Sequence, residues 1–210
     1  MDDIKQVNKA WEQWLTLDNW DVFATLNFGQ LSLLEGDKTD ASGKLWRSCL
    51  STIDRAIFGH TRKDKPRFNR IAFRHYGANG TNPHVHILVK SPIPTHEFCV
   101  ALNAIWATKF TPAASPANNS IAPLITATGA IGYGQHEEFK NDTGAFEDRL
   151  SYINLGFPHL VREDALQRLH AKATQANLVK ARLALPNHIR ISQENFDRRE
   201  RTRVAALLRP

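Results

Sequence analysis

The stretch of sequence that decides the fold is residues 71–90, IAFRHYGANGTNPHVHILVK. Two short runs rich in apolar and β-branched residues flank a turn rich in Gly and Asn, a pattern that is typical of two strands joined as a hairpin. The first run ends at His75, and the second begins with His84 and continues through His86. We therefore predict a hairpin that carries three histidines near its turn.

Periodicity and turn signals predict the elements around this hairpin. A strand, WDVFATLNF, is expected over residues 20–28, where β-branched and aromatic residues are interleaved with polar ones. The mixture of strands and helices favours an α+β fold, with a central antiparallel or mixed sheet and flanking helices, over a doubly wound parallel sheet. Apolar residues at helical spacing predict helices over residues 4–17, 42–58 with Ser42 as N-cap, 95–110, 145–155 and 164–183, ending before Pro186, and a further strand is expected over 121–128.

Composition narrows the class of protein. The chain has 210 residues, of which 42% are hydrophobic and 23% charged, as in ordinary globular proteins. Lys and Arg outnumber Asp and Glu by 27 to 21, and this basic excess favours a nucleic-acid partner. The two cysteines, Cys49 and Cys99, suggest neither a disulfide framework nor a cysteine zinc cluster. With no signal peptide or apolar run of about 20 residues, we expect a soluble cytoplasmic protein without a membrane partner.

The three histidines predict a metal site. His84 and His86 flank Val85, and because side chains alternate along a strand, both imidazoles must project from one face. The hairpin would bring His75 beside them. Three imidazole ligands leave positions open for water and substrate, as catalytic metal sites require. The alternative is that these histidines are structural.

Two motifs resemble a known family. NPHVHILVK, residues 82–90, looks like the His-hydrophobic-His (HUH) motif of the HUH endonucleases, and FATLNF, residues 23–28, looks like the first-strand motif of their rolling-circle replication initiators. The resemblance implies a Rep-like nuclease fold with the HUH motif on a central strand. It implies a nuclease domain over residues 1–160, with its core between 20 and 155, followed by a C-terminal helical extension with a basic tail over 161–210.

The resemblance also implies the metal and its ligands. In this family a metal-binding residue, often Glu, lies on the strand before the HUH pair, and His75 matches that position. His75, His84 and His86 are therefore the expected ligands of Mn²⁺ or Mg²⁺, and His in place of Glu shifts the expected preference toward Mn²⁺ or a softer ion. Asp148 is a candidate fourth ligand.

The family uses a tyrosine after the HUH strand as nucleophile. Tyr152 in EDRLSYINL is the first candidate, and Tyr133 in IGYGQ is the second. Many family members have Lys three residues after the tyrosine, whereas Leu155 stands there after Tyr152. The implied reaction is metal-dependent, site-specific nicking and joining of single-stranded DNA through a 5′-phosphotyrosine, which would start rolling-circle replication of a phage or plasmid in a bacterial host. The alternatives are a transposase or mobilisation relaxase, a non-catalytic DNA-binding protein, and a metal-dependent phosphate-ester hydrolase.

Basic residues before and within the first hairpin strand are candidates for contact with DNA phosphates, with a solvated loop as the alternative. The expected partners are single-stranded DNA or a hairpin origin, together with host helicase and polymerase. The basic tail, residues 196–210, is either a solvated helix or an arm that contacts DNA. The candidate DNA-binding residues are Arg62, Lys63, Lys65, Arg67, Arg70 and Arg74.

Overall fold

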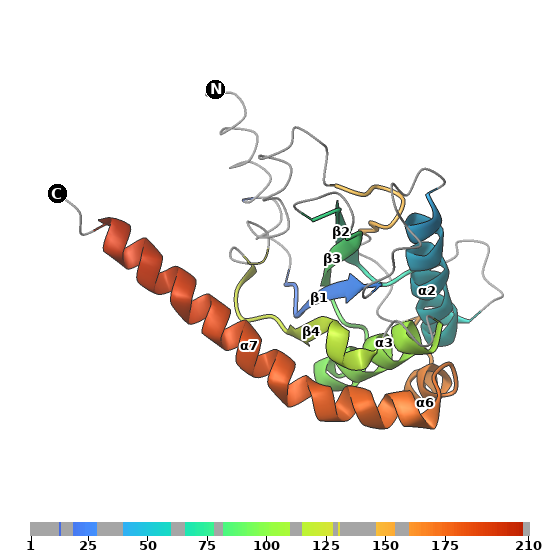
Figure 1. Cartoon of the computed structure of the whole chain (residues 1–210). Coiled ribbons are helices and arrows are strands. Elements are labelled where there is room, and N and C mark those ends of the chain that lie inside the picture. Colours follow the sequence, from blue (N-terminus) through green and yellow to red (C-terminus); the bar gives the residue numbers. More distant parts are fainter. Residues whose placement is uncertain are drawn as a thin grey trace.

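The fold was examined in a computed structural model, which describes residues 13, 19–28, 40–59, 66–77, 82–109, 115–127, 130, 146–153 and 160–207. In this part of the chain, helices lie against a small sheet (Figure 1). The expected helix over residues 4–17 lies almost wholly outside the described residues. The elements are β1 (Val22–Asn27), α2 (Ala41–Phe58), β2 (Arg70–His75), β3 (His84–Val89), α3 (Thr95–Lys109), the 3₁₀ turn η2 (Pro116–Asn118), β4 (Ser120–Pro123), α6 (Ala165–His170) and α7 (Gln175–Leu207).

The sheet has four strands in the order β2-β3-β1-β4, and every neighbouring pair is antiparallel. The predicted hairpin is confirmed as β2 and β3, and the predicted α+β class with a central antiparallel sheet is also confirmed. The HVH stretch lies on β3, an interior strand of the sheet. The more specific expectation of a Rep-like nuclease fold stays a prediction.

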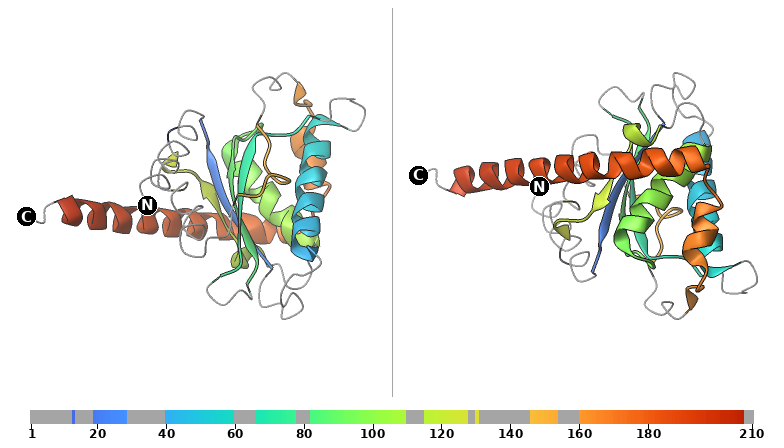
Figure 2. Two further views of the ribbon diagram at one scale, coloured as in Figure 1. Left: turned by 90° about the horizontal axis from the view of Figure 1, so that it is seen from above. Right: turned by 90° about the horizontal axis from the view of Figure 1, so that it is seen from below.

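The two faces of the sheet have different surroundings. On one face, Val85 and Ile87 of β3 join Leu26 of β1 in a core that also contains Trp46 of α2 and Trp106 of α3. Figure 2 shows α2 and α3 on this side of the sheet. The other face carries the histidines and a smaller apolar cluster, which is made of Trp20, Ile71, Phe73, Leu88 and Ala130. Helices α2 and α3 therefore do not cover the face of the sheet that carries the histidines.

Helix α2 begins at Ala41, one residue before the start of the predicted range, 42–58. Asp40 stands at the N-cap position with a φ of 52°, whereas the expected cap, Ser42, is buried inside the first turn. The Asp40 carboxylate accepts hydrogen bonds from Arg47 at 2.7 Å and from Arg74 at 2.8 Å. Although partial burial acts in the opposite direction, these two guanidinium groups hold the pKa of Asp40 below its usual value. Asp40 thus joins the start of α2 to β2.

The prediction of a helix over residues 145–155 is wrong. In the described part of this segment, residues 146–153, Phe146 pairs with Phe73 and Tyr152 pairs with Arg70 along the outer edge of β2. Tyr152 and Arg70 exchange two backbone hydrogen bonds of 2.8 Å. An unpaired sheet edge leaves N–H and C=O groups without partners, and satisfying them outweighs the weak helical preference of one short segment.

The last helix also differs from the prediction. Pro186 lies inside α7 instead of ending a helix before it. Proline removes one helical hydrogen bond, but residues on both sides of it are held in the core. Leu178 and Leu185 belong to the main apolar cluster, and the buried His188 accepts a hydrogen bond at Nδ1 from the backbone N–H of Ile121 in β4, at 3.4 Å. Residues 196–207 form the last part of α7, and no described helix is long and apolar enough to cross a membrane.

A buried ion pair connects α2 with β2. Two nitrogens of Arg70 donate to the two carboxylate oxygens of Asp54, each at 2.9 Å, and Nε of Arg70 donates to the carbonyl of Leu150 at 2.9 Å. Asp54 also accepts from the backbone N–H of Phe68 at 3.1 Å. Such a pair is costly to break because the remaining charge stays buried without its partner.

We expect Asp54→Ala to lower the free energy of unfolding by about 3–5 kcal/mol, the usual cost of leaving one buried partner of an ion pair uncompensated. Urea unfolding followed by circular dichroism would measure this change. Arg67→Ala is the control, since Arg67 is exposed. A loss below about 1 kcal/mol, the range of exposed ion pairs, would contradict the structural role of this pair.

His188 predicts a pH dependence of stability. Burial lowers the pKa of His188 below its usual value, because the charged form is poorly solvated there. The unfolded chain then binds a proton near pH ~6.5 that the folded chain does not, so stability must fall as the pH drops below that value. Between pH 7 and 5 the wild type should lose more thermal stability than His188→Gln. Equal losses in the two proteins would show that His188 contributes nothing to this dependence.

Candidate metal centre

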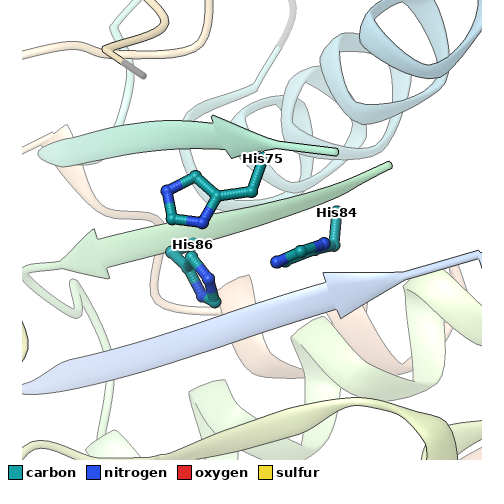
Figure 3. Close-up of side chains that lie close together, drawn as sticks. All are labelled: His75, His84 and His86. Carbon is teal, nitrogen blue, oxygen red and sulfur yellow. The ribbon is translucent and has the colours of Figure 1, made fainter. Parts of the chain in front are cut away.

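The three predicted histidines lie together at one end of the hairpin. His75 is directly opposite His84 in the β2–β3 register, and Phe73 is opposite His86. The ring centroids of His75 and His86 are 4.5 Å apart, those of His84 and His86 are 4.9 Å apart, and those of His75 and His84 are 5.3 Å apart. Figure 3 shows the three rings on the same side of the strands. The sequence prediction that these side chains share one face is confirmed.

Burial differs between the three rings. His75 and His86 are 0% and 1% exposed, whereas His84 is only half-buried. An ion held by all three would therefore be enclosed by the sheet on one side and approached from the side of His84. This combination suits a site that must admit a substrate.

Neighbouring groups orient two of the rings. Nδ1 of His84 lies 2.8 Å from the carbonyl oxygen of Asn82, which can only accept, so this nitrogen carries the proton and Nε2 is available as a ligand. Nδ1 of His86 lies 2.8 Å from the hydroxyl of Thr25 on β1, and this bond likewise leaves Nε2 for a metal. The ring of Phe23 stacks on His86 at 5.6 Å with an interplanar angle of 11°.

The donor set fits a divalent metal ion. One ligand atom from each histidine lies within 4.8 Å of the others, and among the described residues these three form the group capable of holding an ion. A tetrahedral ion with bonds of about 2.1 Å separates its ligand atoms by about 3.4 Å, so the rings must draw together slightly on binding. The group can therefore bind a metal through three nitrogens, with further coordination positions left open.

Asp148 does not join this group. It is exposed in the turn at residues 148–150, which lies beside the start of β2, and its Oδ1 accepts from the backbone N–H of Arg149 at 2.8 Å. A helix over residues 145–155 would have placed Asp148 one turn from Tyr152 on the same face. Because that helix does not form, the geometric reason for this assignment is lost.

Tyr152 is also not brought to the histidines. It pairs with Arg70, the first residue of β2, whereas His75 is the last. Five residues of strand separate these positions by about 16 Å at ~3.3 Å per residue. Tyr76 follows His75 directly, but its ring lies 5.3 Å from the guanidinium of Arg74, whose side chain bonds Asp40 on the helix side. Tyr133 lies outside the described residues.

The expected DNA-binding residues have three different outcomes. Arg62, Lys63 and Lys65 lie outside the described residues, while Arg67 is exposed, with its guanidinium 5.6 Å from the centroid of the Tyr152 ring. Arg70 is 3% exposed, and its partners are those of the buried ion pair.

Arg74 has internal partners as well. It donates to Asp40 at 2.8 Å and to Ser42 at 2.6 Å, and its guanidinium lies 5.4 Å from the ring centroid of Trp46. Alternation along β2 directs both Arg70 and Arg74 toward α2, so the expectation that they contact DNA phosphates is corrected to a structural role.

Thr25 and Asn82 orient the site, and neither residue was predicted from the sequence. A signal for Thr25 was present, since FATLNF alternates and would place Thr25 on the same face as Phe23. The pairing of Thr25 with His86, however, depends on the register between strands that are 61 residues apart.

No family model, curated protein or solved structure matches the chain.

We expect Thr25→Val to weaken the binding of divalent metal by about 10- to 100-fold, the usual effect of removing a hydrogen bond that orients a ligand. Isothermal titration with Zn²⁺ would measure this change. Thr52→Val is the matched control, because the Thr52 hydroxyl donates to Ser48 within α2, away from the histidines. An unchanged dissociation constant in Thr25→Val would show that the Thr25 hydroxyl does not support the site.

Proposed function

We propose that this protein is a metal-dependent endonuclease that nicks and rejoins single-stranded DNA at a specific site through a 5′-phosphotyrosine, and that it starts rolling-circle replication of a phage or plasmid. The observation that supports this proposal most strongly is the histidine group. Two histidines in HxH spacing lie on an interior strand, a third faces them from the neighbouring strand, and one side of the group is accessible. This is the arrangement that the resemblance to HUH endonucleases leads one to expect.

His75, His84 and His86 would hold the metal ion. A divalent ion bound there supplies Lewis-acid chemistry, which stabilises the charge that develops on a scissile phosphate. The proposed ion is Mn²⁺ or Mg²⁺, and a third imidazole in place of a carboxylate favours Mn²⁺, since Mg²⁺ prefers oxygen ligands. Thr25 and Asn82 keep the two HxH rings oriented for this task.

The proposed nucleophile is the hydroxyl of Tyr133. Ala130 packs in the same cluster as Phe73, which is directly opposite His86. Tyr133 follows Ala130 by three residues in the sequence. Tyr152 is held at the far end of β2, so Tyr133, the second candidate from the sequence, is the proposed nucleophile.

The proposed transfer of the DNA phosphate to tyrosine needs no reactant besides the protein and the DNA strand. The tyrosine oxygen forms a bond to phosphorus, and the bond from phosphorus to the 3′ oxygen breaks, which leaves a 5′-phosphotyrosine and a free 3′-hydroxyl. The phenolic proton must be taken up as the bond forms, because phenol has a pKa near ~10, and a proton is delivered to the departing 3′ oxygen. The reverse reaction joins the strand. The free 3′ end can prime synthesis by a host polymerase, with a host helicase opening the duplex, in the bacterial cytoplasm.

The test is covalent capture. The wild type is incubated with Mn²⁺ and labelled single-stranded oligonucleotides that tile the native replicon, and adducts are detected on a denaturing gel. We expect an adduct that requires metal, and we expect Tyr133→Phe to reduce its yield by at least about 100-fold, since no other group replaces the nucleophile.

Tyr152→Phe is the control and should retain most of the adduct. If Tyr152→Phe loses the adduct and Tyr133→Phe keeps it, the nucleophile assignment is wrong and β2 must exchange its edge partner during catalysis. If both variants cleave DNA and release a free 5′ phosphate, water is the nucleophile and the protein is a metal-dependent hydrolase. Tight binding with no cleavage of any native sequence would contradict the proposed activity altogether.

A further inference from the structure

A shallow hollow of about 290 Å³ lies on the outer edge of β2. The segment that pairs with this edge forms most of its wall, and β2 forms its floor. The hollow is separate from the histidine group, and nothing in the proposed cleavage step uses it. It is lined by Ile71, Phe146, Asp148, Ser151, Tyr152 and Ile153.

Two hydrophobic side chains are exposed at the hollow. Phe146 and Ile153 are each 37% exposed, and both lie in the same small space above the buried Ile71. Exposed hydrophobic residues are common on protein surfaces, but an aromatic ring beside aliphatic side chains in a hollow offers a surface on which a flat apolar group can stack. A nucleobase offers such a surface to an aromatic ring.

The polar groups around the hollow select the kind of ligand. Asp148 contributes an exposed carboxylate, which accepts one backbone hydrogen bond from Arg149 and has capacity for more. A carboxylate can only accept, so it favours ligands that present N–H groups. The exposed guanidinium of Arg67 lies 5.6 Å from the ring centroid of Tyr152, which also lines the hollow. This cation provides a contact for a phosphate beside the ligand.

The hollow and the histidine group lie toward opposite ends of β2. Ile71 and His75 project from the same face of β2, because their partners Leu88 and His84 follow the same alternation. Four residues of strand separate them by about 13 Å.

We propose that this hollow binds one unpaired nucleobase of single-stranded DNA, and that it prefers cytosine to thymine. Phe146 stacks on the base, Asp148 accepts from the exocyclic amino group, and Arg67 contacts the backbone phosphate. Thymine has no exocyclic amino group and leaves the carboxylate without a donor. This inference rests on the proposed function, because it takes single-stranded DNA as the substrate.

The test measures binding without cleavage. Fluorescein-labelled dC15 and dT15 are titrated with protein in EDTA at one fixed salt concentration, and fluorescence anisotropy gives the dissociation constants. We expect the wild type to bind dC15 about tenfold more tightly than dT15, the effect of one hydrogen bond to a charged group. Asp148→Asn should reduce this ratio to about one, because an amide both donates and accepts.

Phe146→Ala should weaken the binding of both oligonucleotides by roughly 5- to 100-fold, the range for loss of one base-stacking contact. Val179→Ala is the matched control, since Val179 is exposed on α7, far along the chain from the hollow. Because Asp148 is exposed, Asp148→Asn tests the site even if Phe146→Ala lowers the stability of the fold.

The outcomes separate the two proposals. If the wild type binds DNA but neither variant changes affinity or the dC15-to-dT15 ratio by more than twofold, the hollow is not a base site, whatever the result of covalent capture. If both variants act as expected while no adduct forms, the base site stands and the nuclease proposal fails. If dCMP displaces dC15 at equal concentration, a free nucleotide is the ligand and the assignment to a strand is overturned. If the wild type binds neither oligonucleotide, both proposals lose their substrate.

Discussion

The register between β2 and β3 is the constraint on which the site depends. His75 lies opposite His84, and His86 follows on the same face, so the three rings meet only in this pairing. A slip of one residue would turn a whole strand over, which would place Val85 and Ile87 on the histidine face and the imidazoles against the helices. The apolar core under α2 and α3 prevents this slip. Packing on one face of the sheet therefore fixes the chemistry on the other.

The two arginines of β2 lie on the face of the sheet that packs against the helices. Arg70 and Arg74 point toward α2 and bind Asp54 and Asp40, so their charges hold the helix to the sheet. The exposed Arg67 lies just before the strand, outside this alternation. The face with the histidines carries Ile71, Phe73 and Leu88 beside them. Arginines that lie close to the histidines in the sequence therefore do not show which surface would contact DNA.

Local patterns predicted the hairpin and the histidine group because strand alternation and a Gly/Asn turn are short-range features. The place of Tyr152 could not be predicted in this way. Its partner Arg70 lies 82 residues earlier in the chain, and a sheet edge that requires pairing overrides a weak helical periodicity. Pro186 gave the opposite error, because contacts of Leu185 and His188 with the core hold α7 across the proline. The prediction for Asp148 failed for the same reason, because it also assumed a helix over residues 145–155.

The central claim is that His75, from the strand before the HxH pair, completes one metal centre with His84 and His86. Titration of the wild type and His75→Ala with Co²⁺, followed by visible absorption, tests this claim most directly. We expect one Co²⁺ per chain in the wild type, and at least about a 100-fold weaker affinity with an altered ligand-field spectrum in His75→Ala, because a three-nitrogen site becomes a two-nitrogen site. The same affinity and spectrum in both proteins would show that the ion is bound without His75.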